Sequence, residues 1–228
     1  AYYAGKAKSE IAYFSSACEL KNGVFSDEKC IYHVKNGEKC RIMAIDDIKL
    51  PGTHNLENYM AAFAATYGFV SDAICSEVAK SFNGVEHRLE RVRELNGVVF
   101  INDSIGTSPT RTKAGLMALK TKPILIAGGY DKHIPFDELG DDICLYAKKL
   151  FLTGDTAEKI AEAVRASRYY REDFPMVIMD DFKDTVLSAA ESAETGDIVL
   201  LSPACAAFDR FKNFSVRGRY FKQIVMEL

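Results

Sequence analysis

The sequence predicts an α/β protein, in which a β-meander and two helices precede a doubly wound, mainly parallel sheet. Two observations carry this prediction. Short β-type segments with Asn-Gly pairs beside them occupy the start of the chain, and from about residue 85 apolar strand patterns alternate with helical ones. Strands that alternate with helices indicate βαβ units, and such units build parallel sheets.

The start of the chain is predicted to be an antiparallel meander. β-type patterns cover residues 11–15, 24–34 and 40–50, with Asn22-Gly23 and Asn36-Gly37 between them. Asn-Gly between two strands is a strong hairpin signal, because both residues of the turn take positive φ.

Two helices are predicted to follow the meander. Helical patterns cover residues 55–69 and 71–82, and Ser71 is a good N-cap for the second. This first part contains no obvious central sheet of its own. We therefore expect residues 1–83 to belong to a larger domain, with a boundary near Phe82-Asn83-Gly84.

The second part, residues 84–228, is predicted to be a complete Rossmann-like domain. Strand patterns occur at residues 98–102, 123–127, 150–153, 176–179 and 197–201, and helical patterns at residues 109–119, 156–167 and 182–193. After Ser202-Pro203 the spacing is helical again, with aromatic residues at positions 208, 211 and 214. In an open parallel sheet, ligands bind where strands end and helices begin, so we expect these aromatic side chains to line or close a site.

Composition excludes several classes of function. The chain has 228 residues, 48% of them apolar, and a net charge of −3. It therefore carries no positive excess that would attract nucleic acid or an anionic membrane surface. No apolar run approaches the length of a membrane span, and the first residues do not form a signal peptide. We expect a cytoplasmic protein.

The cysteines do not predict a metal site. No two of the six cysteines stand in a C-x-x-C spacing, and the four histidines are not clustered with them. His33 and His133 show no partners in the sequence and receive no role. Cys205 follows a strand end at a predicted helix start, where a thiolate could be stabilised. It has no histidine nearby in sequence, so we favour a buried, inert thiol over a nucleophile.

Polar and glycine residues follow two strand ends. Asp103 could accept hydrogen bonds from sugar hydroxyls, although Asn102 and Asp103 could instead form an Asx turn. Gly128-Gly129 would let the backbone approach a ligand, and Lys132 supplies a cation for a carboxylate or phosphate. The chain contains neither a G-x-G-x-x-G fingerprint nor a phosphate loop.

Two further candidates precede the Rossmann-like part. Asn55 and Asn58 are three residues apart and share a helix face, where their amides could read a base edge. The alternative for Asn55 is a helix cap. Arg88 could hold a phosphate, and its alternative is a surface salt bridge.

In this order, the motifs resemble those of the Mur ligases. The marks are Gly52-Thr53-His54-Asn55 to Asn58, Glu86-His87-Arg88, Asn102-Asp103-Ser104, Gly128-Gly129-Tyr130-Asp131-Lys132 and Leu201-Ser202-Pro203-Ala204-Cys205-Ala206. The last mark, with Phe208-Asp209 and Phe211-Lys212-Asn213-Phe214, resembles the members that add D-glutamate. Mur ligases have a UDP-sugar domain, a central ATPase domain and a C-terminal Rossmann-like domain. The resemblance covers the end of the second and all of the third, so we expect a C-terminal fragment.

The resemblance implies an ATP-dependent ligase of peptidoglycan precursor synthesis. ATP phosphorylates the carboxylate of UDP-N-acetylmuramoyl-L-alanine, and the amine of D-glutamate attacks the acyl phosphate. Lys132 and Arg88 would be catalytic. ATP would be bound by His54, Asn55, Asn58, Arg88 and Asp103, and D-glutamate by Thr107, Lys132, Ala207, Phe208 and Phe214. The family also implies Mg²⁺, with its ligands mainly outside this chain, and we expect a bacterial cytoplasmic monomer.

Two positions depart from the family pattern. Ile105 stands where a lysine is common, and Arg111 is a candidate to supply the charge instead. Ala207 stands where a serine is common, so one hydroxyl donor is missing.

Other functions stay open. The alternatives are another Mur ligase, a folylpolyglutamate synthase, or a non-catalytic module that binds a small anion or a partner protein. Because the phosphate loop is missing, we expect the 228-residue chain alone to be inactive as a ligase and to bind ATP weakly.

Overall fold

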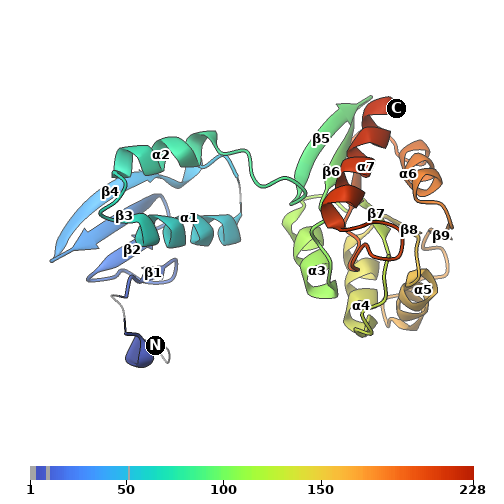
Figure 1. The fold of residues 1–228 in the computed structure, drawn as a ribbon, viewed down its shortest axis with the longest axis horizontal. Coiled ribbons are helices and arrows are strands. Elements are labelled where there is room, and N and C mark those ends of the chain that lie inside the picture. Colours follow the sequence, from blue (N-terminus) through green and yellow to red (C-terminus); the bar gives the residue numbers. More distant parts are fainter. Residues whose placement is uncertain (1–3, 9–10, 51) are drawn as a thin grey trace. The chain divides into compact units, whose positions relative to one another are not determined.

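The computed structural model describes residues 4–8, 11–50 and 52–228, except for the side chains of Ala4 and His54. The chain divides into two compact units, which we call unit 1 (residues 1–84) and unit 2 (residues 85–228). Figure 1 draws them in blue to teal and in green to red, respectively. Among the helices that the structure describes, none combines the length and apolar character needed to cross a membrane.

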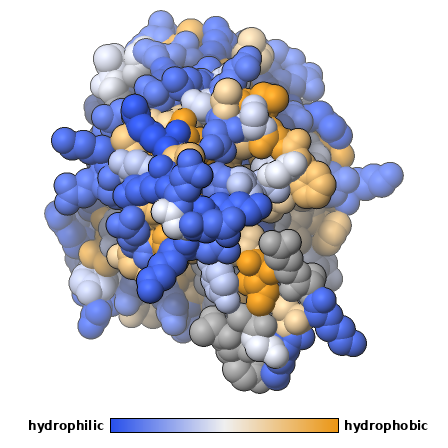
Figure 2. All heavy atoms as spheres, turned by 90° about the vertical axis from the view of Figure 1, so that its left-hand side faces the viewer, coloured by the Kyte–Doolittle hydropathy of each residue, from blue (hydrophilic) through white to orange (hydrophobic). Residues whose placement is uncertain are grey.

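Unit 1 is a four-stranded sheet with two helices. Its strands lie in the order β1 (Phe14–Ser15), β2 (Gly23–Ser26), β3 (Cys30–Lys35) and β4 (Glu38–Ala44). The helices are α1 (Thr53–Thr66) and α2 (Asp72–Ser81), and the short 3-10 turns are η1 (Ala4–Lys6) and η2 (Ile45–Asp47). Apolar side chains of the sheet, among them Val24 and Ile31, pack against Met60 and Phe63 of α1 and form the core of this unit. The face drawn in Figure 2 is mainly hydrophilic, and its hydrophobic residues form small separate areas.

The predicted meander is confirmed at one hairpin and wrong at the other. Asn36 and Gly37 have φ of 52° and 83° and join the paired residues Lys35 and Glu38. Asn22-Gly23 forms no hairpin, because β1 and β2 run parallel. The other hairpin lies inside residues 24–34, where the side chain of Asp27 accepts hydrogen bonds from the backbone N–H groups of Lys29 and Cys30. An Asp side chain can close such a turn without an Asn-Gly pair.

Unit 2 has a six-stranded sheet in the order β5-β6-β10-β7-β8-β9. The strands are β5 (Glu90–Leu95), β6 (Val98–Asn102), β7 (Ile124–Ala127), β8 (Lys149–Leu152), β9 (Met176–Ile178) and β10 (Ile198–Leu201). The helices are α3 (Pro109–Ala118), α4 (Asp137–Tyr146), α5 (Ala157–Ala166), α6 (Phe182–Glu191) and α7 (Phe214–Glu227). Only β5 is antiparallel to its neighbour. The doubly wound, mainly parallel sheet is therefore confirmed.

Sequence reasoning missed two elements of unit 2 and misplaced a third. β5 is rich in charged residues because it is an edge strand, so it lacks the apolar pattern of the others. α4 begins with acidic residues and was not predicted. The helix expected directly after Ser202-Pro203 starts only at Phe214, where the Asn213 side chain caps it. Residues 202–213 instead form an irregular segment.

Side chains alternate between the two faces of the central strands. On β7, Leu125 and Ala127 pack in one cluster with residues of α3, α4 and α5. Ile124 and Ile126 pack in the other, with residues of α6 and α7. This period of two, with both faces buried, explains why the strands read as continuous apolar runs.

The order of strands creates a switch point at the carboxyl edge. β10 lies between β6 and β7. The chain leaves β6 and β7 toward helices on one face and leaves β10 toward α7 on the other. The loops therefore diverge at this place, which is where open α/β sheets bind ligands.

Two glycines of unit 2 provide a test of how closely these loops pack. Gly128 and Gly196 both have positive φ, 110° and 95°. A Cβ on Gly128 would lie 2.0 Å from the carbonyl oxygen of Thr153, whereas one on Gly196 would meet nothing within 4 Å. Gly128→Ala should lower the free energy of unfolding of unit 2 by about 2 kcal/mol more than Gly196→Ala does. Urea unfolding measures both, and equal losses would contradict the clash.

Candidate functional site

Three loops meet at the switch point. Lys132, from the loop after β7, donates a hydrogen bond from Nζ to the carbonyl oxygen of Thr107, at 2.7 Å. Ser104, from the loop after β6, donates from Oγ to the carbonyl oxygen of Phe214 at 2.8 Å. The N–H of Tyr130 donates to the carbonyl oxygen of Ala206, from the segment after β10, at 3.0 Å. Residues predicted from three separate strand ends are therefore neighbours, while their binding roles stay predictions.

The guanidinium of Arg217 ties two of these loops together from α7. Nε and Nη2 donate to Oγ and the carbonyl oxygen of Ser104, at 3.0 and 3.1 Å. Nη2 also donates to the carbonyl oxygen of Cys205, and Nη1 to that of Ala206, both at 3.0 Å. Arg217 is 2% exposed. Burial lowers the pKa of its guanidinium to about 10, so it still carries its charge at neutral pH.

Sequence reasoning missed Arg217, since a helical arginine far from any strand end gives no local signal. The backbone of Gly129, however, lies close to the Arg217 guanidinium. A Cβ there would lie 3.0 Å from Nη1 of Arg217 and 2.4 Å from the carbonyl oxygen of Ala206. Protein atoms therefore fill the space on the Cβ side of both glycines, and the approach of a ligand to this backbone stays a prediction.

Asp103 is held inside the unit. Its carboxylate accepts hydrogen bonds from Ser202 Oγ at 2.7 Å and from the N–H of Leu89 at 3.2 Å. Burial raises the pKa of Asp103 to about 6, while the bonds from Ser202 and Leu89 and the charges of Arg88 and Arg111 act to lower it. Only 5% of the residue is exposed. Its ribose contact stays a prediction, whereas its contacts in the structure join loops of unit 2.

The predicted Asx turn forms at Asn102 rather than Asp103. Oδ1 of Asn102 accepts the N–H of Ser104 at 3.1 Å, and its amide nitrogen lies 2.9 Å from Nδ1 of His87. His87 is buried. Burial lowers the pKa of its imidazole, whereas the charges of Glu86 and Glu90 act to raise it. His87, the residue before Arg88, therefore fixes this segment to Asn102 at the end of β6.

Glu86, His87 and Glu90 bring three metal-binding atoms together within 4.8 Å. The ammonium of Lys222 already donates to both carboxylates, at 3.1 Å for Glu86 and 2.5 Å for Glu90. Mg²⁺ is usually held by one or two carboxylates and several waters, but here the ammonium of Lys222 occupies both carboxylates. In this arrangement the group does not fit that ion.

Several predicted residues present exposed side chains at this edge. Phe208 is 65% exposed and packs edge-to-face on Tyr130, with 5.9 Å between ring centroids. Arg111 donates from Nη1 to the carbonyl oxygen of Ile105, at 3.4 Å. Its charge therefore lies directly beside the position that lacks the lysine. Lys132 and Arg88 are also exposed.

Two small residues of the segment after β10 are buried instead. Ala207 is 1% exposed, so it can offer only backbone groups to a ligand. Cys205 is 2% exposed, and burial raises the pKa of its thiol to about 11. The prediction that the Cys205 thiol is buried is confirmed, and its raised pKa is consistent with an inert thiol. Its predicted position at a helix start is wrong.

The candidates in unit 1 lie on α1. The helix has its N-cap at Gly52, so Asn55 lies in the first turn and is not the cap. Asn55 is half-buried and Asn58 is exposed. The side chain of His54 lies outside the described part of the chain. His33, to which the sequence gave no partner, packs against Tyr67 with 3.7 Å between ring centroids.

His133 also has a partner, since its Nδ1 lies 3.4 Å from the carboxylate of Asp131. That carboxylate accepts the N–H of His133 at 2.7 Å and pairs with Lys159. The cation of Lys159 is the main cause of the lowered pKa of Asp131. Asp131 therefore braces the loop that presents Lys132.

Residues 87–205, just over half of the chain, match the family described as Mur ligase, glutamate ligase domain. A UDP-N-acetylmuramoylalanine–D-glutamate ligase of Ruminiclostridium cellulolyticum is 46% identical over 226 residues, which are 98% of this chain and 49% of that protein. One of Clostridium botulinum is 46% identical over 229 residues, 99% of this chain and 49% of that protein. The chain thus spans about half the length of the curated relatives it matches.

Solved structures show the same fold. MurC, a UDP-N-acetylmuramate-alanine ligase of Thermotoga maritima, matches with a TM-score of 0.60 at 15% identity, over 87% of this chain and 42% of that one. FolC of Escherichia coli, in complex with ADP, matches with a TM-score of 0.60 at 14% identity, over 91% of this chain and 47% of that one.

The raised pKa of Asp103 predicts a pH dependence. A carboxyl group with a raised pKa in the folded state favours folding most below its unfolded pKa, and this contribution is lost as pH rises toward about 6. The stability of the parent chain, relative to Asp103→Asn, should therefore fall by on the order of 3 kcal/mol between pH 4 and pH 7. Denaturant unfolding at several pH values measures it. A difference that does not change with pH would refute this assignment.

Removing the Arg217 guanidinium would leave the carbonyl groups of Ser104 and Cys205 buried without a donor, while that of Ala206 would keep the N–H of Tyr130. Arg217→Met should destabilise unit 2 by about 3 kcal/mol or more. Arg219→Met, on the exposed side of the same helix, should cost less than about 0.5 kcal/mol. Thermal or urea unfolding compares the two variants, and similar losses would argue against a special role for Arg217.

Proposed function

Because this chain belongs to the Mur ligase family, we propose that it supplies the amino-acid-binding part of an ATP-dependent ligase that joins D-glutamate to UDP-N-acetylmuramoyl-L-alanine. In this reaction ATP phosphorylates the alanyl carboxylate, and the amine of D-glutamate attacks the acyl phosphate. An amide, ADP and phosphate result. The names of relatives at 46% identity support this choice of substrate.

The observation that carries the proposal is the contact between Lys132 and Thr107 at the switch point of unit 2. D-glutamate has two carboxylates, which need cations and N–H donors. The Lys132 ammonium has three donors and uses one on the carbonyl oxygen of Thr107, so two stay available for a carboxylate. A group held in this way needs no reorganisation when the substrate arrives.

Other groups at the same edge complete the proposed D-glutamate site. The Thr107 hydroxyl, the backbone at Ala207 and the ring of Phe214 would surround the amino acid, and the exposed ring of Phe208 would form its apolar wall. Arg111 would supply the second cation in place of the lysine that is absent at Ile105, since its guanidinium contacts the Ile105 carbonyl group. Orientation of the amine toward the acyl phosphate is the main contribution of such a site.

The nucleotide roles are proposed for each unit separately. In residues 1–83 of the central ATP-binding domain, His54, Asn55 and Asn58 would bind ATP. In residues 84–228, Arg88 would face the γ-phosphate and Asp103 the ribose. The ADP bound to the related FolC fold supports nucleotide use. Mg²⁺ would accompany ATP. Among the described residues, the one group of three metal-binding side chains is paired with Lys222, so we assign no step to Mg²⁺.

We place the whole enzyme in the bacterial cytoplasm as a monomer, where ATP and the UDP-linked precursor are available. The DNA upstream of the codon for Ala1 separates the ligase from a non-catalytic module. An in-frame phosphate loop there supports the ligase, and a natural start codon near Ala1 supports the module. Assays of the full gene product with D-glutamate, L-lysine and diaminopimelate separate it from other ligases of this fold.

Lys132→Met in the full gene product tests the amino-acid site. Loss of a charged hydrogen bond should raise KM for D-glutamate about tenfold or more, with a smaller effect on KM for ATP. Lys120→Met is the matched control, because Lys120 is exposed after α3, near the amino end of β7. Steady-state kinetics with each substrate measures both variants. An unchanged KM for D-glutamate in the Lys132 variant would refute the assignment.

A further inference from the structure

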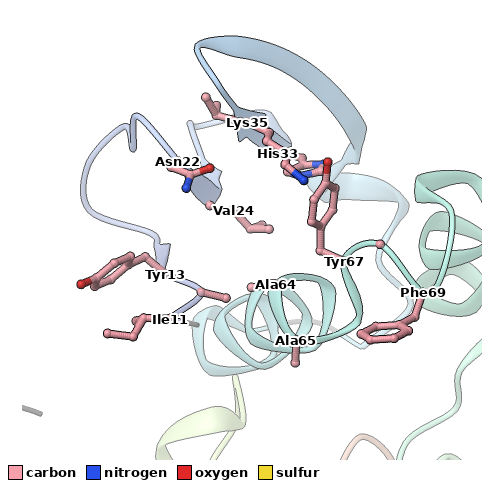
Figure 3. A pocket seen from close by; sticks show the side chains of 14 residues that line it. Ile11, Tyr13, Asn22, Val24, His33, Lys35, Ala64, Ala65, Tyr67 and Phe69 are labelled. Atoms are coloured by element: carbon pink, nitrogen blue, oxygen red, sulfur yellow. The ribbon is translucent and has the colours of Figure 1, made fainter. Parts of the chain in front are cut away.

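Unit 1 contains a pocket that no role described so far uses. It has a volume of about 410 Å³. Figure 3 shows Asn22 and Lys35 on one side, His33 and Tyr67 beside them, and Ala64 of α1 opposite. The volume lies within the range of pockets that bind small molecules.

The pocket is separate from the predicted ATP contacts. Asn55 and Asn58 lie in the first two turns of α1, whereas Ala64 and Ala65 lie in its last turn. Ten residues of helix separate Asn55 from Ala65, which is about 15 Å along the helix axis. A ligand here would therefore not compete with the predicted nucleotide contacts of this helix.

Lys35 supplies the positive charge of the pocket lining. The lining contains no aspartate or glutamate, and Nδ1 of His33 lies 3.7 Å from the carboxylate of Asp72, which is outside the lining. The ammonium of Lys35 lies 5.0 Å from the centroid of the Tyr67 ring, and within the described chain no carboxylate pairs with it. Lys39, on the neighbouring strand, instead pairs with Glu19 at 3.2 Å. Lys35 is thus a cation at a pocket rim without an acidic partner.

The rest of the lining suits a flat apolar group. Val24 and Ala64 are buried and form the inner wall. The Tyr67 ring stands edge-on to the His33 imidazole, with 3.7 Å between centroids and an interplanar angle of 75°. A planar ring could pack against this aromatic pair while its charged end faces Lys35. The amide of Asn22 can donate to the same charged end.

From this combination we propose that the pocket binds a small aromatic carboxylate. The carboxylate is held by the Lys35 ammonium and the Asn22 amide, and the ring lies between Tyr67 and Val24. The ligand is one that the proposed ligase reaction does not consume. Binding of this ligand therefore does not depend on that reaction.

Calorimetric titration of the 228-residue chain with 2-naphthoate tests the proposal, with 2-naphthamide as the neutral control of equal shape. We expect the carboxylate to bind and the amide to bind at least about tenfold more weakly, because it cannot form a charged hydrogen bond with Lys35. Equal affinity of the two probes, or no binding of 2-naphthoate at millimolar concentration, would overturn the proposal.

A pair of variants locates the binding. Lys35→Met should weaken 2-naphthoate binding about tenfold, and Lys39→Met should leave it unchanged. Circular dichroism verifies that each variant folds. If both members of the pair act alike, the ligand binds elsewhere and the proposal fails.

Discussion

The buried guanidinium of Arg217 is the constraint on which the candidate site of unit 2 depends. Loops are usually the most variable parts of an α/β domain, because they lie on the surface and have few contacts. Here one side chain donates to carbonyl groups of Ser104, Cys205 and Ala206, from the loops after β6 and β10. A guanidinium suits this task, since its donors form a rigid planar fork that can serve several acceptors at once.

The same principle recurs at the other loops of unit 2. Asp103 joins Ser202 to Leu89, and Asn102 holds the buried ring of His87 beside Arg88. Asp131, paired with Lys159, braces the loop that presents Lys132. In each case a buried or paired polar group fixes the backbone, while a neighbouring cation stays exposed. This arrangement of buried supporting groups and exposed cations suits a binding edge, because the support is rigid and the binding groups face solvent.

Unit 1 shows a different use of its elements. One helix, α1, carries the predicted nucleotide residues near its first turn and lines the pocket with its last turn. The sheet contributes the other wall through β2 and β3, and packing between Met60, Phe63 and the strands holds helix and sheet together. One rigid helix can therefore serve two chemically distinct places without bringing them into contact.

The sequence predicted those features that follow from local pattern. Apolar runs marked the five parallel strands of unit 2, and Asn36-Gly37 marked a hairpin, because a turn with two positive φ angles has few alternatives. It also predicted which strand ends precede Lys132 and Thr107, and the contact between these two residues follows from the parallel sheet. The charged strand β5 and the helix α4, which begins with acidic residues, were not predicted, since edge strands and surface helices lack a continuous apolar pattern.

Tertiary structure alone decided the rest. The sequence could not show that Arg217 is buried, that protein backbone fills the space beside Gly128, or that β1 pairs parallel to β2. Each depends on residues far apart in the chain, such as Arg217 and Ser104 or Gly128 and Thr153. Hydrogen bonds and steric contacts act over a few ångströms of space, whatever the separation in sequence. A local pattern therefore specifies which groups a segment offers, and only the folded chain decides which partners they meet.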